Sequence, residues 1–536
     1  MDESNIEINS KHQLQNSSLK EENDLDNESN TTFESGDLGD VFTSNRMLGY
    51  IDAIMATSAT FLVVPIKNIK ELESNNTFSH YLINMRTEFI MFFLGFTIVL
   101  TIWENMNVRS LVVKKVDDFI LTFIILEILA TIVLPFALYL QGSYPDQYVP
   151  IILTCCVLGI IQILDIFLIF YAIKNTKLLH TKIQNWSIIE LRRFRSIVLV
   201  RPVLCLILVI IGGMLCLVHY AISWGFIAIL TLMPIFRNLY LYARRRMKTS
   251  KRIEKYEFYY YFSKKNIPKE RIEVMSDAAF AIIASLIILD ITTKFSEKVD
   301  SDMSLNHQLK DNLLEFYTFL ATFGIVSTLW YVNHCVFHLF RTVPAVALYI
   351  QKIFLAFCCL CPLAANMILK FGTKGDESSS SSICYASLIV FCASMGNFFL
   401  FLYGFLTKDK YFYKWATFGR SFRTMSQQNK YIIFKTINVP FWSLLCALCS
   451  LSPPKIALYI LCGCFLATPT SFFIAKLVFM THVGKCLHFR KIYLKNDVSN
   501  KTATLVQSQE NVLNSNNSLD LELANENHIS LEDEKS

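Results

Sequence analysis

The sequence predicts an all-α membrane protein with 12 transmembrane helices, arranged as two parallel six-helix repeats. Three observations lead to this fold class: the chain is strongly apolar, its apolar residues gather in twelve runs, and its halves share a motif. Of the 536 residues, 53% are hydrophobic and only 18% are charged, and the mean hydropathy is +0.39. A soluble protein of this length needs more charge on its surface, so the composition places the chain in a lipid bilayer.

The apolar runs are the predicted spans. Most have about 17 to 25 residues, the length at which a helix crosses the hydrocarbon layer. A transmembrane β-barrel would instead need shorter segments of alternating polarity. The predicted spans are 50–66, 87–106, 117–140, 149–171, 197–218, 220–242, 274–291, 313–338, 344–370, 383–406, 432–450 and 456–480.

The two ends of the chain differ from the spans in composition. Residues 1–44 and 492–536 are polar and acidic and hold few large apolar side chains, so we expect both to be disordered tails. The net charge of +6 does not indicate nucleic-acid binding, because the Lys and Arg residues lie in short loops between spans. Loops rich in Lys and Arg stay in the cytosol, and their distribution places both tails there.

Two further segments follow from this topology. A basic linker, 244–270, joins the first repeat, 45–243, to the second, 271–491. Its Lys and Arg residues indicate an orientation signal more than a site for anionic lipid, although both interpretations stay open. On the opposite side of the membrane, Asn75 lies in an Asn-Asn-Thr sequence and is a candidate for glycosylation.

The two halves of the chain show an internal repeat. Arg46 and Asp52 recur as Arg271 and Asp277 at an offset of 225 residues. A unit of six spans returns the chain to the side from which it started, so both copies cross the membrane in the same direction. Further identical pairs are Ala53 and Ala278, Ala56 and Ala281, Ala59 and Ala284, Trp103 and Trp330, and Pro135 and Pro362.

A stripe of small and hydroxyl residues follows the first helix of each repeat, at helical spacings of three and four. Such a stripe is typical of closely packed membrane helices, and it is also suited to the wall of a water-filled pore. Composition alone favours close packing, but hydroxyl groups at the same depth in both repeats favour a pore, so the two interpretations stand equal. The stripe residues are Ala53, Thr57, Thr60 and Val64 in the first repeat, and Ala278, Ile282, Ser285 and Leu289 in the second.

Four carboxyl groups lie inside or at the edge of predicted spans. An unpaired carboxylate there costs about 3 kcal/mol, so each needs a partner or water. For Asp52 and Asp277 a polar clamp between helices is favoured over direct ion binding. For Glu127 and Asp165, protonated and packed carboxyl groups explain the sequence as well as a transport role does.

No cofactor, metal or enzyme activity is predicted. His334 and His338 have a spacing of four that can bind zinc, but no third ligand accompanies them. Cys446 and Cys449 form a Cys-x-x-Cys sequence in the middle of a span, without a second pair nearby.

The motif of the first helices resembles the transmembrane-protein-175 family of endolysosomal potassium channels. The signature of this family is an Arg, three variable residues and Phe-Ser-Asp, followed by a Trp in the next helix. Tyr50 and Ile51 replace Phe and Ser in the first repeat, so we expect a polar network there that is weaker or differently connected. The residues that carry the resemblance, and with it this network, are Arg46, Asp52, Trp103, Arg271, Ser276, Asp277, Trp330 and His334.

This resemblance implies a channel of endosomal or lysosomal membranes that passes potassium ions and also protons. It implies further that two chains form a homodimer and that the first and seventh helices of each chain line the pore. Carried over by position, the narrowest ring falls on Thr57 and Ile282.

The main alternative is a twelve-helix secondary transporter, because two parallel six-helix halves are also common in that class. The loop between 107 and 117 lacks the Gly-rich motif of major facilitators, and no substrate site is evident. No span carries Arg at every third position, as a voltage sensor would. A current that rises linearly with driving force would favour the channel.

Overall fold

The computed structural model describes residues 44–67, 78–184, 186–246, 267–297, 307, 310, 313–372, 377–413, 416 and 427–478. The segment with Asn75, nearly all of both tails and most of the basic linker lie outside these residues.

All twelve predicted spans fall on helices, which confirms the predicted fold class. The first repeat contains α2 (Ser44–Phe61), α3 (Val64–Lys67), α4 (Phe78–Asn84), α5 (Arg86–Ser110), α6 (Asp118–Ser143), α7 (Tyr148–Lys174), η1 (Thr176–Leu178), α8 (Thr181–Gln184), α9 (Ile188–Leu215) and α10 (Tyr220–Arg246). The second contains α12 (Lys269–Glu297), α14 (Leu313–Phe337), α15 (Ala345–Cys359), α16 (Cys361–Met367), the π-helix η3 (Ile368–Gly372), α17 (Glu377–Leu406), α18 (Lys408–Tyr411), α19 (Gln427–Cys449) and the helix Pro454–Val478.

Among the described residues, 11 helices are long and apolar enough to cross a membrane. The remaining predicted span, 220–242, lies in α10, whose apolar part, Tyr220–Met233, is shorter, although the helix continues to Arg246. Large apolar side chains are exposed along most of these helices, as is expected for surfaces that face lipid.

Local sequence explains where two of the helices begin. Asp117 caps α6, because its side chain accepts a hydrogen bond from the backbone N–H of Ile120 at 2.9 Å. Ser187 and Glu190 form a capping box at the start of α9. This helix therefore begins at Ile188, before the predicted start at 197, because hydropathy alone does not detect the charged segment that contains Glu190, Arg192 and Arg195.

The repeats share their packing order as well as their sequence motif. In the first repeat α5 and α6 pack on α2, and in the second α14 and α15 pack on α12. An isolated backbone bridge joins Val113 to Leu179, and Phe340 is joined to Phe412 in the same way. The architecture is therefore duplicated down to the connections between helices.

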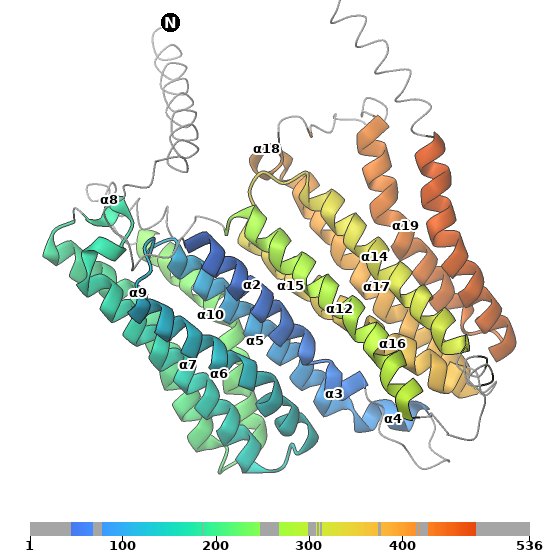
Figure 1. Cartoon of the computed structure of the whole chain (residues 1–536), viewed down its shortest axis with the longest axis horizontal. Helices are drawn as coiled ribbons and strands as arrows, with labels where there is room; N and C mark the ends of the chain where they lie inside the picture. Colours follow the sequence, from blue (N-terminus) through green and yellow to red (C-terminus); the bar gives the residue numbers. More distant parts are fainter. Residues whose placement is uncertain are drawn as a thin grey trace, which may run out of the picture.

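The repeats meet along their first helices, so α2 lies beside α12 across the middle of the molecule (Figure 1). Next to this contact α5 packs against α15, and a buried ion pair joins them. The Nζ atom of Lys352 lies 2.8 Å from Oε2 of Glu104. The Lys352 side chain is only 2% exposed, so this pair stabilises the two repeats in one relative position.

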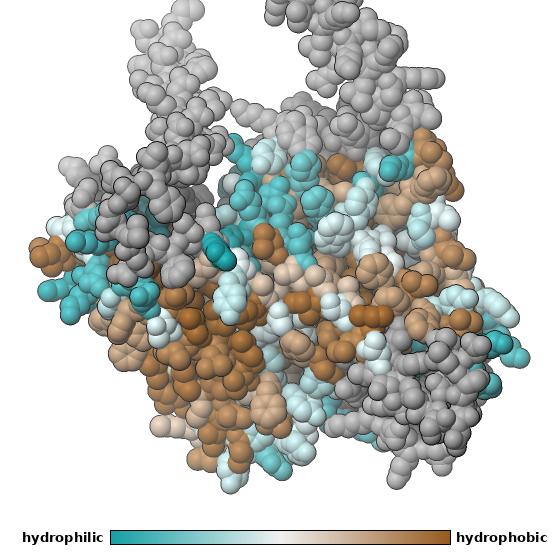
Figure 2. All heavy atoms as spheres, viewed as in Figure 1, coloured by the Kyte–Doolittle hydropathy of each residue, from teal (hydrophilic) through white to brown (hydrophobic). Residues whose placement is uncertain are grey.

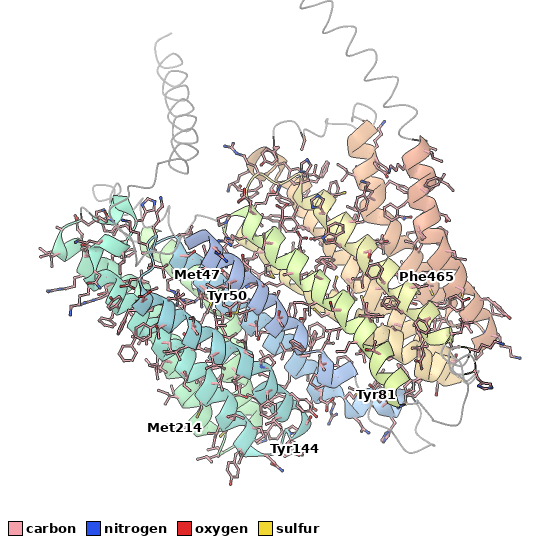
Figure 3. The ribbon with its side chains drawn as sticks, in the orientation of Figure 1. Met47, Tyr50, Tyr81, Tyr144, Met214 and Phe465 are labelled. Carbon is pink, nitrogen blue, oxygen red and sulfur yellow. The ribbon has the colours of Figure 1, made fainter. Side chains whose placement is uncertain are left out.

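A small aromatic cluster joins the repeats at the opposite end of α2 from its first turn. Phe78 and Tyr81 of α4 pack against Phe371, with ring centroids 5.4 and 5.8 Å away. Tyr81 lies far from Met47 and Tyr50, which mark the start of α2 (Figure 3). Burial, together with the nearby Glu88, raises the pKa of Tyr81 above its usual range, so the phenol stays neutral.

Candidate ion pathway and its polar network

The first helices of the two repeats are joined by an ion pair near their N-terminal ends. Nη1 of Arg271 in α12 donates to Oδ2 of Asp52 in α2 at 2.8 Å. Asp52 is 0% exposed. Because each residue lies near the start of its own helix, α2 and α12 enter the membrane from the same side, as a parallel repeat requires.

Asp52 also accepts a hydrogen bond from α5, the second membrane span of its own repeat. Nε1 of Trp103 in α5 donates to Oδ1 of Asp52 at 2.8 Å, and the Trp103 side chain is completely buried. Both carboxylate oxygens of Asp52 are therefore engaged, one by the first repeat and one by the second.

The equivalent residues of the second repeat form a more open arrangement. Nε1 of Trp330 donates to Oδ1 of Asp277 at 2.7 Å, but both side chains are exposed. The ring of His334 stacks on Trp330, with centroids 5.9 Å apart. Arg46, the counterpart of Arg271, is exposed and has no partner within the part of the chain that the structure describes.

The loss of the motif Ser in the first repeat was expected to weaken the network around Asp52 or to connect it differently. The geometry agrees with the second of these alternatives. Within one chain, Asp52 has the larger set of partners and Asp277 the smaller. The reason is that Arg271 of the second repeat contacts the carboxylate of the first, which a comparison within each motif could not indicate.

Ser276 belongs to a separate network of neutral groups, here called the amide network. Nε2 of Gln351 donates to Oγ of Ser276 at 2.9 Å. The Gln351 amide also exchanges hydrogen bonds with Asn333, whose Nδ2 in turn donates to Asn397 at 2.8 Å. Sequence reasoning missed these three amides, although polar residues inside apolar spans were a signal that could have identified them.

The first repeat contains instead a charged triad of Arg109, Glu127 and Asp165. The Arg109 guanidinium bonds both carboxylates, and its Nη2 lies 2.6 Å from Oε2 of Glu127. All three side chains are at most 13% exposed. The interpretation of these acids as protonated, packed groups is therefore replaced by an ion-paired one, which was missed because Arg109 was assigned to a loop.

The predicted stripe on α2 is only partly accessible. Ala53 is exposed and Thr57 and Val64 are half-buried, whereas Thr60 is 0% exposed. Thr60 donates to the carbonyls of Ala56 and Thr57 within its own helix, so its hydroxyl is satisfied without water. In the single chain Thr60 therefore does not lie on the accessible face of α2, whereas Phe61 is 47% exposed there.

On α12 the predicted stripe is accessible along its length. Ala278 and Ile282 are half-buried, and Ser285 and Leu289 are exposed. Figure 2 shows a paler strip over α2 and α12, less hydrophobic than the brown surface over α7 and α9 beside it. The two first helices thus present a shared face of small, hydroxyl and apolar side chains next to the motif residues.

Within the described ranges, no group of three or more His, Cys, Asp or Glu residues could hold a metal ion. The site consists of the accessible face of α2 and α12, the Asp52 and Asp277 carboxylates with their hydrogen-bond donors, and the buried polar networks. These features, in a chain of two parallel six-helix repeats, define a multi-pass membrane protein of the channel or transporter class.

Comparison with known proteins supports the family resemblance. The profile described as endosomal/lysosomal potassium channel TMEM175 matches residues 46–135 and 271–362. Each match begins at a motif arginine and covers the first two spans of a repeat and most of the third. These matches confirm the resemblance to the TMEM175 family that the motifs predicted, and the family is described as one of potassium channels.

Curated relatives agree with this resemblance. Proteins named endosomal/lysosomal proton channel TMEM175 from Danio rerio and Mus musculus are 23% and 24% identical to the chain over 389 and 476 residues. These alignments cover 70% and 85% of the chain, and 74% and 91% of the relatives. The Homo sapiens protein of the same name is 24% identical over 366 residues. The names support an ion channel as the class of this protein.

Proposed function

We propose that this protein is a cation channel of endosomal or lysosomal membranes that conducts potassium ions and protons. The observation that carries the proposal is that both repeats match a channel family from their first helix onward, and that these first helices lie side by side. The family description supports potassium and the names of the relatives support protons. Both chain ends would lie in the cytosol, where the basic loops are expected.

The conducting path would run along the shared face of α2 and α12. Thr57 and Ile282 would form its narrowest part, because both are half-buried and occupy matching positions, each eleven residues after the motif arginine. Ala53, Val64, Ala278, Ser285 and Leu289 would line the path on either side. A constriction of this kind controls ions through its width and through the apolar surface that it offers to water.

Two copies of the chain would complete the path as a homodimer. In one chain Arg271 pairs with Asp52, whereas Arg46 is unpaired within the described part and Asp277 is exposed with one hydrogen-bond donor. A two-fold axis beside α2 and α12 would let Arg46 of one copy reach Asp277 of the other. The same type of ion pair would then join all four first helices around the path.

Electrical recording from enlarged endolysosomes that overexpress the protein tests this function. With potassium, sodium and proton gradients imposed in turn, a channel gives a current that rises linearly with driving force. The reversal potential should follow the potassium gradient at neutral pH and shift toward the proton potential when the lumen is acidified. A flux that saturates with substrate and requires a fixed ratio of two ions would indicate the transporter instead.

A further inference from the structure

A groove on the lipid-facing side of the first repeat is not explained by ion conduction. It opens between α6, α7 and α9 and has a volume of about 350 Å³. Its lining includes five aromatic side chains and two cations: Phe119, Phe123, Phe167, Phe170, Tyr171, Lys174 and Arg195.

The walls of the groove are apolar, and their aromatic rings pack against one another. Phe119 stacks on Tyr171 with centroids 4.9 Å apart, and the rings of Phe123 and Phe167 are nearly parallel at 6.4 Å. Phe119 and Phe167 remain 57% and 56% exposed. The groove therefore offers a hydrophobic slot that is open to lipid.

Two positive charges stand at the mouth of this slot. Lys174 is exposed, and the guanidinium carbon of Arg195 lies 5.1 Å from the ring centroid of Phe170. Neither cation has an anionic partner among the described residues. The nearby Asp117 is already engaged by the hydroxyl of Tyr171 and by the backbone N–H of Ile120.

The depth of the groove matches the boundary of the membrane. Lys174 is the last residue of the span Tyr148–Lys174, and Asp118 and Ile188 are the first residues of the neighbouring spans. Figure 2 shows hydrophilic residues gathered over these ends of α7 and α9, next to the brown surface that continues along the helices. The cations thus lie at the level of lipid headgroups and the aromatic rings at the level of acyl chains.

We propose that this groove binds one anionic phospholipid, with its headgroup phosphate between Lys174 and Arg195 and an acyl chain against Phe123 and Phe167. Arg pairs with phosphate through parallel hydrogen bonds, and Lys adds a compact charge. Unpaired cations at the membrane surface attract the anionic lipids of the cytosolic leaflet. A lipid is the occupant, rather than a soluble phosphate, because the charged mouth and the apolar slot are continuous. The site does not depend on the proposed ion path.

Native mass spectrometry of the full-length protein in detergent tests the site. A phosphatidylinositol monophosphate should bind to the wild type in preference to phosphatidylcholine. The Lys174→Gln/Arg195→Gln variant should bind it roughly tenfold more weakly, because it loses both headgroup cations. The matched control, Lys177→Gln/Arg192→Gln, removes the same charge from exposed positions outside the groove and should bind as the wild type does.

Two further experiments distinguish binding of a lipid from binding of a soluble anion. Phe123→Ala should weaken lipid binding while it leaves both cations in place, and excess soluble inositol phosphate should not displace the lipid. The site would be refuted if the groove variant and the control variant bound equally, or if phosphatidylcholine bound as well as the anionic lipid. Displacement by the soluble headgroup, with no effect of Phe123→Ala, would also overturn it. Thermal unfolding of each variant shows that the fold is retained.

Discussion

In the first repeat an ion-paired triad is buried between α5, α6 and α7, whereas in the second a network of amides and a hydroxyl is buried between α12, α14, α15 and α17. The charged triad and the amide network occupy bundles with the same packing order. Polar groups inside a bundle therefore need partners, but the fold does not prescribe whether those partners are charged.

The difference has an energetic consequence. Removing one member of a buried ion group leaves an uncompensated charge and typically costs about 3–5 kcal/mol. An unsatisfied neutral group costs only about 1–3 kcal/mol. The first repeat should consequently be the more sensitive to single substitutions, and the following predictions test this from the largest expected effect to the smallest.

Substitution of Arg109 should have the largest effect. Arg109→Met leaves Glu127 and Asp165 buried beside each other without a cation, and should lower the free energy of unfolding by about 3–5 kcal/mol. Thermal unfolding in detergent, followed by tryptophan fluorescence, measures this loss. Adding Glu127→Gln and Asp165→Asn to the variant should restore most of it, and no rescue would contradict the ion-paired account.

The ion pair between the repeats should give the next largest loss. Lys352→Met leaves Glu104 buried without its cation and should cost about 3 kcal/mol. Because the pair joins α5 to α15, limited proteolysis should also cut between the repeats more readily. The double variant Lys352→Met/Glu104→Gln should recover stability. If the single and double variants are equally unstable, the pair does not join the repeats energetically.

The amide network should tolerate change better. Gln351→Leu removes hydrogen bonds to Ser276 and Asn333 but introduces no buried charge, so a loss of about 1–3 kcal/mol is expected. The same unfolding assay compares it directly with Arg109→Met. A loss as large as that of Arg109→Met would remove the distinction drawn between the repeats.

Substitutions of the two motif carboxylates, Asp52 and Asp277, should affect different properties, the stability of the single chain and the formation of the dimer. Asp52→Asn should lower the stability of the single chain by about 1.5–3 kcal/mol, since it weakens bonds from Trp103 and Arg271. Asp277→Asn should change that stability less and instead weaken the proposed dimer, which mass photometry measures. The charge-swapped variant, Arg46→Asp/Asp277→Arg, should dimerise again. A dimer unaffected by Asp277→Asn would argue against the pairing proposed for Arg46.

Much of the fold could be predicted from the sequence, because hydrophobic length and a repeated motif are local signals. The site could be predicted only in part. Spacings of three and four residues fit more than one helix face, so they could not show that Thr60 points into the chain and Phe61 outward. Which residue pairs with Asp52 depends on how the repeats pack, and Arg109 was missed because residues next to the ends of spans look like loop residues.

The central claim is that α2 and α12 line the ion path. Its most direct test is to record the current through variants with substitutions at the proposed narrowest point. Thr57→Ile adds apolar bulk and removes a hydroxyl, so it should lower the current or raise the preference for potassium. Ile282→Asn should raise the current and weaken discrimination against sodium.

The matched control for these recordings is Thr122→Ile, which makes the same change as Thr57→Ile at an exposed position on α6. At equal expression, it should leave current amplitude and reversal potential as in the wild type. If Thr57→Ile and Ile282→Asn also leave both quantities unchanged, α2 and α12 do not line the narrowest part of the path, and the account is contradicted.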